Sequence, residues 1–349
     1  TARSWSGSRP SSTSPGASDR GRCGQISPPP LRTRRNGVVN YRPLGKSELE
    51  VSEVGFGVWT LASGRWGSFT DDQAVDLLHK AYDAGINYFD VSPTDGAGRG
   101  EQLLGQAFRD KRELVIISSK AGRSEAGADF SPASIRKSLE GTLGRLGSSY
   151  VDVLQLHYPD AATVGNAAIW QTLEALKTEG KIRYYGIALG PGPGGLEEGR
   201  TAMRKHDLGC IQAYYNILEE EPGRKFFPVA LEINQGMVIR APHAGGVLES
   251  DASAVSFPAD GDLQTKDTPW IERARKQATN LRWIYEGKGM TLSQAALKFI
   301  LSEETVASAI PNIYREEQLA EYSAVSDFET FSQVELGEIA EQFRKGFGV

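Results

Sequence analysis

The sequence predicts one α/β domain, a (β/α)8 TIM barrel over residues 41–349, which follows a disordered extension over residues 1–40. Two observations carry this prediction. From Tyr41 onward, short β-branched or aromatic runs alternate with stretches whose apolar residues recur at spacings of three and four. That alternation is typical of βα units in a parallel sheet. Eight such runs can be counted, and eight parallel strands are the number that closes this barrel.

The expected strands are short, and several end in polar side chains. Because the carboxyl ends of barrel strands share one rim, side chains that follow different strands meet there, and active sites are built at that rim. The strands are expected at Val54–Thr60, Ile86–Val91, Leu114–Ser119, Val151–His157, Ile182–Leu189, Cys210–Leu218, Met237–Ala241 and Val306–Pro311.

Helix boundaries between these strands have recognisable signals. Thr70-Asp-Asp-Gln73 is a capping box, and Ser131-Pro132 places proline in a first helical turn. Ala84-Gly85 and Glu179-Gly180 end helices with the residue that tolerates a left-handed backbone. The remaining expectations are a floor hairpin at Tyr41–Leu49, a long loop over the mouth from Glu249 to about Asp267, and closing helices at about Arg315–Val325 and Ser332–Arg344.

Composition excludes several classes of function. The net charge is −5, but residues 1–40 hold seven arginines and one aspartate, so the remainder carries −11. An acidic body gives no electrostatic reason to expect nucleic-acid binding, and no apolar run approaches the roughly 18 residues of a membrane span. Two distant cysteines, Cys23 and Cys210, predict neither a disulfide framework nor a metal site. This small number of cysteines is consistent with a cytoplasmic, reducing location.

The extension is rich in Ser, Pro, Gly and Arg, and too poor in aliphatic residues to offset the entropy of ordering. Its arginine-rich, acid-poor character also suits an organelle transit peptide, which would change the location. The chain begins on Thr1 and shows little amphipathic pattern here, which favours translated upstream sequence or sequence added for expression.

Four ionisable residues follow three consecutive strands. Asp90 and Asp95 lie in Phe-Asp-Val-Ser-Pro-Thr-Asp-Gly, Lys120 ends Ile-Ser-Ser-Lys, and His157 ends Leu-Gln-Leu-His. We expect them to meet at the rim of the barrel.

The chain resembles the aldo-keto reductases. The resemblance is carried by Tyr-Arg-Pro-Leu-Gly-Lys-Ser near the start, Gly-Arg-Gly-Glu-Gln-Leu-Leu-Gly behind Asp90, Gly-Lys-Ile-Arg-Tyr-Tyr-Gly186 and Ala-Ile-Pro311, in order from about residue 41. The resemblance implies a barrel that binds NADP(H) without a Rossmann domain and moves hydride between the nicotinamide and a carbonyl or alcohol.

The family's catalytic set is Asp, Tyr, Lys and His, which places Asp90, Asp95, Lys120 and His157 in those roles. In the family the tyrosine phenol donates the proton, but this chain has Asp95 there. A carboxyl group beside a lysine ammonium is favoured as the ionised form, which is a poor acid near neutral pH. The aspartate side chain is also shorter than that of tyrosine by roughly 3 Å. A catalytic group misplaced by about 1 Å can already reduce the rate about a hundredfold. Repulsion between Asp90 and Asp95 could instead keep a proton shared.

Each residue also has a structural interpretation. Thr-Asp95-Gly is good turn chemistry, Asp90 could cap a turn, Lys120 could be a surface lysine, and His157 a core histidine. The other histidines are weaker candidates: His79 and His206 lie in helical sequence, and His243 is placed near the mouth.

The resemblance implies cofactor contacts along the second half of the chain. Gln212 matches a residue that contacts the nicotinamide amide, and Arg240 replaces an aromatic residue that stacks on the ring; a guanidinium can stack as well or pair with a phosphate. The start of the last barrel helix would favour the extra phosphate of NADP(H). The residues implied there are Asn312, Tyr314, Arg315, Gln318 and Glu321.

Trp59, Trp66 and Tyr158 lie beside expected strand ends and are candidates for an aromatic substrate pocket, with rim packing as the alternative. No metal-binding spacing is present in the sequence. The leading prediction is an NADP(H)-binding oxidoreductase for a small carbonyl, alcohol or sugar-like substrate, altered or impaired by Asp95. The alternatives are a lyase, isomerase or cyclase that uses Asp95, Lys120 and His157, and a catalytically silent NADP(H) sensor.

Overall fold

Eight parallel strands close into the expected barrel in the computed structural model, which describes residues 39–190, 195–221, 223–250 and 266–349. The strand order is β12, β11, β10, β9, β8, β5, β4, β3. Val54 closes the circle through a parallel bridge to Ala309, whose carbonyl accepts the Gly55 N–H at 2.9 Å. The strands are β3 (Phe56–Gly57), β4 (Tyr88–Asp90), β5 (Ile116–Ala121), β8 (Val151–His157), β9 (Ile182–Ala188), β10 (Cys210–Tyr214), β11 (Met237–Arg240) and β12 (Val306–Ile310).

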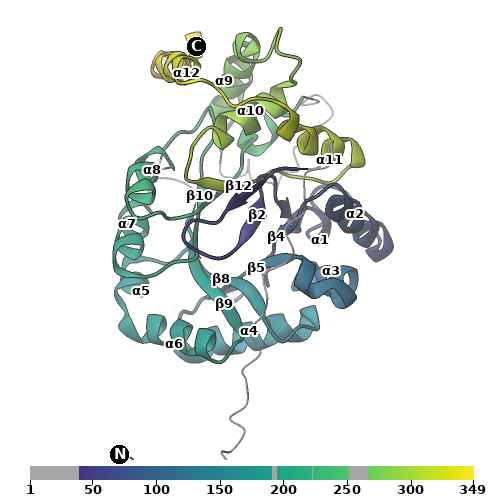
Figure 1. Ribbon diagram of the computed structural model, residues 1–349, viewed down its shortest axis with the longest axis vertical. Coiled ribbons are helices and arrows are strands. Elements are labelled where there is room, and N and C mark those ends of the chain that lie inside the picture. The colour runs from purple at the N-terminus through teal and green to yellow at the C-terminus, as the bar shows by residue number, and fades with distance from the viewer. Residues whose placement is uncertain (1–38, 191–194, 222, 251–265) are drawn as a thin grey trace, which may run out of the picture.

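A helix follows each of these strands and covers the outside of the barrel (Figure 1). The helices bury one apolar face, as the three-and-four spacing requires; Leu77, Leu78 and Ala81 are the buried examples in the first. The predicted caps form at Thr70 and Ser131. These helices are α2 (Asp71–Asp83), α3 (Arg99–Phe108), α4 (Pro132–Leu146), α6 (Ala167–Thr178), α7 (Leu196–Lys205), α8 (Gly223–Glu232), α10 (Leu292–Leu301) and α11 (Glu316–Ser323).

Two strands end earlier than their apolar runs predict, because side chains bend the backbone. Thr60 donates its hydroxyl to the carbonyls of Gly57 and Ile313, at 3.0 and 2.6 Å, and the chain turns into α1 (Trp59–Ala62). Asn216 accepts the N–H groups of Leu218 and Glu219, which ends the extension after β10 in an Asx turn.

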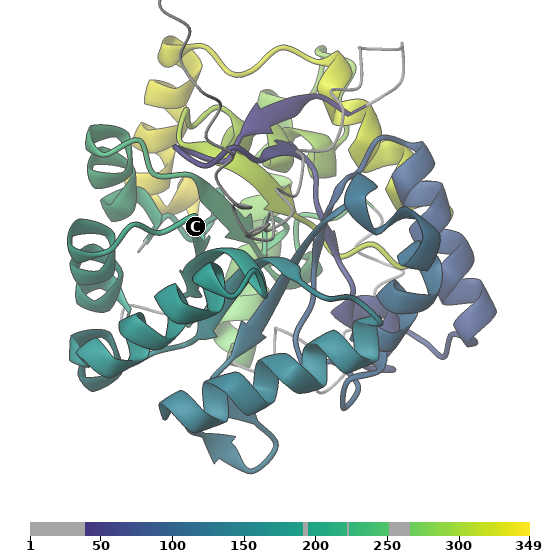
Figure 2. The same ribbon diagram turned by 60° about the horizontal axis from the view of Figure 1, so that its bottom comes forward.

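A hairpin of β1 (Tyr41–Pro43) and β2 (Glu50–Ser52) lies across one end of the barrel, as predicted; it is the purple pair in Figures 1 and 2. Leu44 and Leu49 in its turn are fully buried. They pack on barrel residues such as Val153 and Val238. Because this end is plugged, small molecules enter from the other end, where the strands finish.

Three more α-helices lie in the described part of the chain: α5 (Ala161–Gly165), α9 (Thr268–Thr279) and α12 (Gln333–Arg344). The expected closing helices are α11 and α12. Residues 1–38, Cys23 included, and most of the expected mouth loop lie outside the described residues. Within the described part, no helix is long and apolar enough to cross a membrane.

Candidate active site

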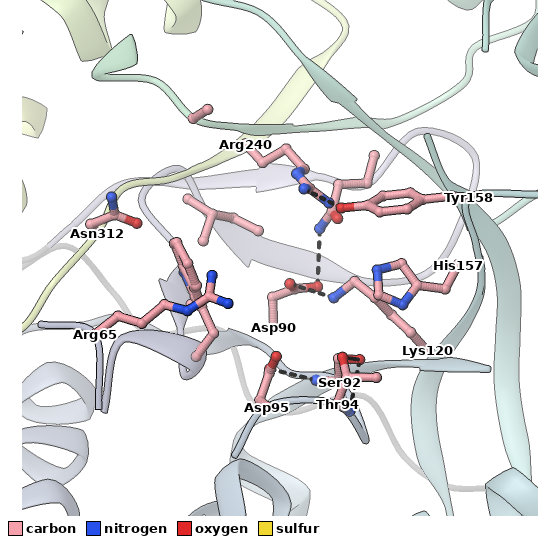
Figure 3. A pocket seen from close by; sticks show the side chains of 15 residues that line it. Arg65, Asp90, Ser92, Thr94, Asp95, Lys120, His157, Tyr158, Arg240 and Asn312 are labelled. Carbon is pink, nitrogen blue, oxygen red and sulfur yellow. Dashed lines mark hydrogen bonds and ion pairs between the residues drawn. The ribbon is translucent and has the colours of Figure 1, made fainter. Parts of the chain in front are cut away.

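The carboxyl ends of the strands surround a cavity of about 230 Å³. Seven of the eight barrel strands contribute to its wall, so the cavity is a product of the barrel topology. Figure 3 shows its side chains pointing toward one another from these separate strands. The residues from the predicted set that line it are Trp59, Asp90, Asp95, Lys120, His157, Tyr158, Gln212, Arg240 and Asn312.

Asp90 lies at the centre of a hydrogen-bonded array. Lys120 donates from Nζ to Asp90 Oδ2 at 2.6 Å and to the Val91 carbonyl at 3.2 Å. Gln212 donates from Nε2 to Asp90 Oδ1 at 3.0 Å. The Lys120 and Asp90 side chains are 5% and 14% exposed, so the ion pair is shielded from water and fixes both groups in one geometry.

His157 is held in its neutral form. Burial, and to a smaller extent the nearby cations Lys120, Arg240 and Arg123, lower the pKa of His157 to about 2. Its buried Nδ1 has no hydrogen-bond partner among the described residues. A neutral imidazole has one donor and one acceptor nitrogen, so His157 can orient a carbonyl or hydroxyl group without supplying charge.

Asp95 lines the cavity, but its carboxylate is engaged locally. Its Oδ2 accepts the Ser92 N–H at 2.8 Å, and the Asp95 N–H donates to the Ser92 carbonyl at 2.9 Å. Burial raises the pKa of Asp95 to about 7, and the Lys120 ammonium acts in the opposite direction. The effect expected from Lys120 is thus opposed by burial and by the Asp90 carboxylate, which favours the alternative in which the two aspartates share a proton.

Arg240 joins two phenols at the cavity wall. Its guanidinium donates to Tyr158 and to Tyr214, the latter at 2.8 Å, and lies 5.1 and 4.5 Å from the centres of their rings. Tyr158 has a left-handed backbone with φ of 56°, which is uncommon outside glycine and clusters at functional sites. This conformation directs its ring from the end of β8 toward Arg240 (Figure 3).

Trp66 is not in the cavity wall. It packs edge-on against Trp59, with 4.2 Å between ring centres, and approaches Tyr314 at 6.5 Å. Arg65, which the sequence analysis missed, does line the cavity. It comes from a loop after α1, where no periodic pattern points to it. His243 is buried, is hydrogen-bonded to the Ser293 carbonyl at 3.1 Å and is not among the residues that line the cavity.

The residues implied for the adenosine end lie beyond the cavity. Asn312 lines the cavity, whereas Tyr314 and Arg315 line a second one of about 360 Å³ beside α2. The Tyr314 N–H donates to Gln318 Oε1 at 3.1 Å, and Glu321 accepts the Thr291 hydroxyl at 2.5 Å. The implied cofactor residues thus extend from the cavity to the start of α11, as an elongated dinucleotide requires.

The nicotinamide end of a dinucleotide fits the donors and acceptors present. Gln212 Oε1 is buried and has no partner in the described part of the chain. A buried acceptor without a partner is costly, and a carboxamide N–H would satisfy it. By contrast, no group of three or more His, Cys, Asp or Glu side chains among the described residues could hold a metal ion.

Comparisons with known proteins agree with this geometry. The uncharacterized oxidoreductase YqkF of Bacillus subtilis is 29% identical over 310 residues, covering 85% of this chain and 94% of the relative. L-galactose dehydrogenase of Arabidopsis thaliana is 27% identical over 315 residues, covering 85% and 93%. The holo form of aldo-keto reductase AKR11C1 from Bacillus halodurans superposes with a TM-score of 0.70 at 25% identity, covering 87% and 96%. The aldo/keto reductase family model matches residues 53–342, and the chain therefore belongs to the aldo/keto reductase family.

Proposed function

We propose that this protein binds NADP(H) and transfers hydride between the nicotinamide and a small carbonyl compound or alcohol, with chemistry altered by Asp95. The observation that carries the proposal is the array of Asp90, Lys120 and Gln212 beside a neutral His157 in one cavity. The nicotinamide supplies the hydride when it is bound. The protein would supply orientation, a shielded site and the proton.

Each side chain has a defined task in this proposal. Gln212 would hold the carboxamide through its unpartnered Oε1, and His157 would hydrogen-bond the substrate oxygen. Lys120, held in place by Asp90, would stabilise negative charge that develops on that oxygen. The proton would come from Asp95, whose pKa of about 7 allows the acid form at and below neutral pH.

Asp95 also limits the proposed activity. Its carboxylate accepts the Ser92 N–H, so one oxygen is committed to the turn and only the other can hold a transferable proton. As pH rises above 7 the acid form is lost. We therefore propose a carbonyl reduction that is weak and favoured on the acid side of neutrality.

The cavity favours a small substrate with polar or negatively charged groups. Arg65 and Arg240 add positive charge to the wall. Trp59 and Tyr158 offer flat faces. A sugar-like or carboxylated carbonyl compound matches both properties.

A titration of NADPH and NADH, followed by nicotinamide fluorescence, tests the proposal. Binding is expected below millimolar concentration, together with slow oxidation of NADPH in the presence of small aldehydes at pH 6. Absence of binding by either cofactor at millimolar concentration would remove the proposal.

One observation favours a second function. A carboxyl group with a pKa near 7 is suited to general acid–base catalysis without any redox step, and Lys120 lies in the same cavity. Conversion of a substrate to an isomer or elimination product without cofactor would support this reading. Tight cofactor binding with no turnover of any kind would instead indicate a sensor.

A further inference from the structure

Arg65 brings a positive charge into the cavity from the loop that joins α1 to α2. Its side chain lines the cavity wall, and it forms no hydrogen bond or ion pair with another described residue. In Figure 3 the Arg65 guanidinium points toward the middle of the cavity, on the opposite side of Asp90 from His157. A guanidinium that points into a cavity and has no carboxylate beside it is suited to bind an anionic group of a ligand.

The loop that carries Arg65, residues 63–70, is closed at its base by a second arginine. Arg99, at the start of α3, donates from Nη1 to the Leu61 carbonyl at 2.8 Å and from Nη2 to the Phe69 carbonyl at 2.7 Å. It also pairs with Asp71 at 2.7 Å. One guanidinium thus joins the two ends of the loop and fixes its position on the barrel.

The tip of the same loop is fixed by packing. Gly64 and Gly67 have φ values of 73° and 111°, which glycine adopts without strain, and they turn the chain on either side of Arg65 and Trp66. Trp66 then packs edge-on against Trp59, with 4.2 Å between ring centres. Because the base and the tip are both held, the loop presents Arg65 to the cavity from a defined place.

The cavity wall carries more positive than negative side chains. Among the described residues that line it, Arg65, Lys120 and Arg240 are basic, whereas Asp90 and Asp95 are acidic. Lys120 and Asp90 pair with each other. The charge of the remaining groups is therefore positive whether or not Asp95 is protonated. Such a wall attracts a negatively charged substrate and gives a neutral one no corresponding advantage.

We propose that Arg65 binds a carboxylate group of the substrate while Lys120 and His157 hold its carbonyl oxygen. The substrates are then small aldehydes or ketones with a carboxylate at the far end of a short chain, because Arg65 and His157 lie on opposite sides of Asp90 (Figure 3). The carbonyl end rests on the proposed function, whereas the carboxylate contact can be measured without it. Of the two substrate classes that match the cavity, this contact selects the carboxylated one over the neutral, sugar-like one.

The expected effect of removing Arg65 follows from the strength of a charged contact. A hydrogen bond to a charged group contributes on the order of 10- to 100-fold to affinity. Arg65 is exposed, so water screens its charge and the lower end of this range applies. Arg65→Leu should therefore weaken binding of a carboxylate about tenfold and leave a neutral analogue unaffected.

The first test compares the turnover of 4-oxobutanoate and of its methyl ester with NADPH at pH 7. The two compounds share an aldehyde and differ in the charge at the far end. The wild type should have the higher kcat/KM for the acid. Arg65→Leu should lower kcat/KM for the acid about tenfold, through KM, and leave the ester unchanged. Arg65→Lys keeps the charge and should restore part of the loss.

The matched control is Arg136→Leu, because Arg136 pairs with Glu179 on the surface and lies outside the cavity wall. It removes the same charge from the protein and should retain the preference for the acid. An equal loss in Arg136→Leu and Arg65→Leu would show a general effect of net charge and overturn the role of Arg65. A loss of the same size for the acid and the ester would overturn it as well.

The second test uses the protein without cofactor. Binding of butanoate and of butanamide is followed by tryptophan fluorescence, since Trp59 lines the same cavity as Arg65. The wild type should bind butanoate more tightly than butanamide, and Arg65→Leu should bind the two alike. A wild type that shows no preference for the carboxylate, or an Arg65→Leu variant that keeps it, would overturn the inference. Absence of NADPH binding would remove the proposed function, and this comparison would still decide whether Arg65 binds a carboxylate.

Discussion

Replacing Asp95 by tyrosine is the perturbation that bears most directly on the proposed chemistry. Asp95 lines the cavity beside Asp90, Lys120 and His157, and it stands where the family resemblance leads one to expect a phenol. A correctly placed general acid contributes about 10²- to 10⁴-fold to a proton-transfer step. We therefore expect Asp95→Tyr to increase the rate of NADPH-dependent aldehyde reduction at pH 8 by a factor in that range.

The same substitution should also lower the stability of the fold, by an amount that follows from the contacts of Asp95. The Ser92 N–H, which now donates to Asp95 Oδ2 at 2.8 Å, loses its acceptor, and Ser92 is 3% exposed. Leaving a buried donor without a partner costs about 1–3 kcal/mol. The free energy of unfolding should fall by that amount in urea, which a barrel of this size can tolerate.

The assay follows NADPH absorbance with a panel of small aldehydes, and Asp95→Phe is its control. Phenylalanine matches the ring and loses the same Ser92 contact, but has no hydroxyl group. Faster reduction by Asp95→Tyr than by the wild type, with no increase for Asp95→Phe, would show that the missing phenol limits the rate. Equal rates for the two variants, with NADPH bound in both, would refute the reasoning and show that another feature of the cavity limits turnover.

Three further predictions follow from the contacts. The raised pKa of Asp95 means that the folded protein binds this proton more tightly than the unfolded chain does, so the free energy of unfolding of the wild type should fall as the pH rises from about 4 to about 7. Asp95→Asn should remove this fall when urea unfolding is compared at pH 5 and pH 8. Gln212→Leu should weaken NADPH binding about fivefold, from the loss of roughly 1 kcal/mol of hydrogen bonding. Gln155→Leu, at a buried glutamine outside the cavity wall, should leave NADPH binding unchanged. Asp90→Asn should lower the free energy of unfolding, measured in urea, by about 3–5 kcal/mol, because it leaves the buried Lys120 without its ion-pair partner. Adding Lys120→Met should restore part of this loss. A double variant less stable than the single variant would contradict this account.

Strands could be predicted from the sequence because buried parallel strands appear as short β-branched runs. The prediction of Val151–His157 matches β8 residue for residue. It failed at the ends of the first and sixth barrel strands, where apolar residues continue but the hydroxyl of Thr60 and the amide of Asn216 turn the backbone. Such turns depend on hydrogen bonds that apolar periodicity does not encode.

The candidate site divides in the same way. Asp90, Lys120 and His157 could be placed together because topology alone brings the ends of neighbouring strands to one rim. Arg65 could not, since it lies in a loop after α1 whose path is set by tertiary packing. The effect of a neighbouring lysine on the pKa of Asp95 can be read from the sequence, whereas the burial that opposes it depends on the tertiary structure.

The geometry around Asp95 separates two explanations for its presence. The following turn is tight: a Cβ on Gly96 would lie 2.3 Å from the Ala62 carbonyl oxygen, so this position accommodates only glycine without rearrangement. An acceptor at position 95 that satisfies the Ser92 N–H stabilises this turn, and a phenol would not reach back to do so. If turn stability alone maintains the aspartate, asparagine should replace it without any change in turnover, since its carbonyl oxygen accepts the same N–H. If the aspartate also supplies the proton, Asp95→Asn should abolish the acid-side activity while leaving NADPH binding intact.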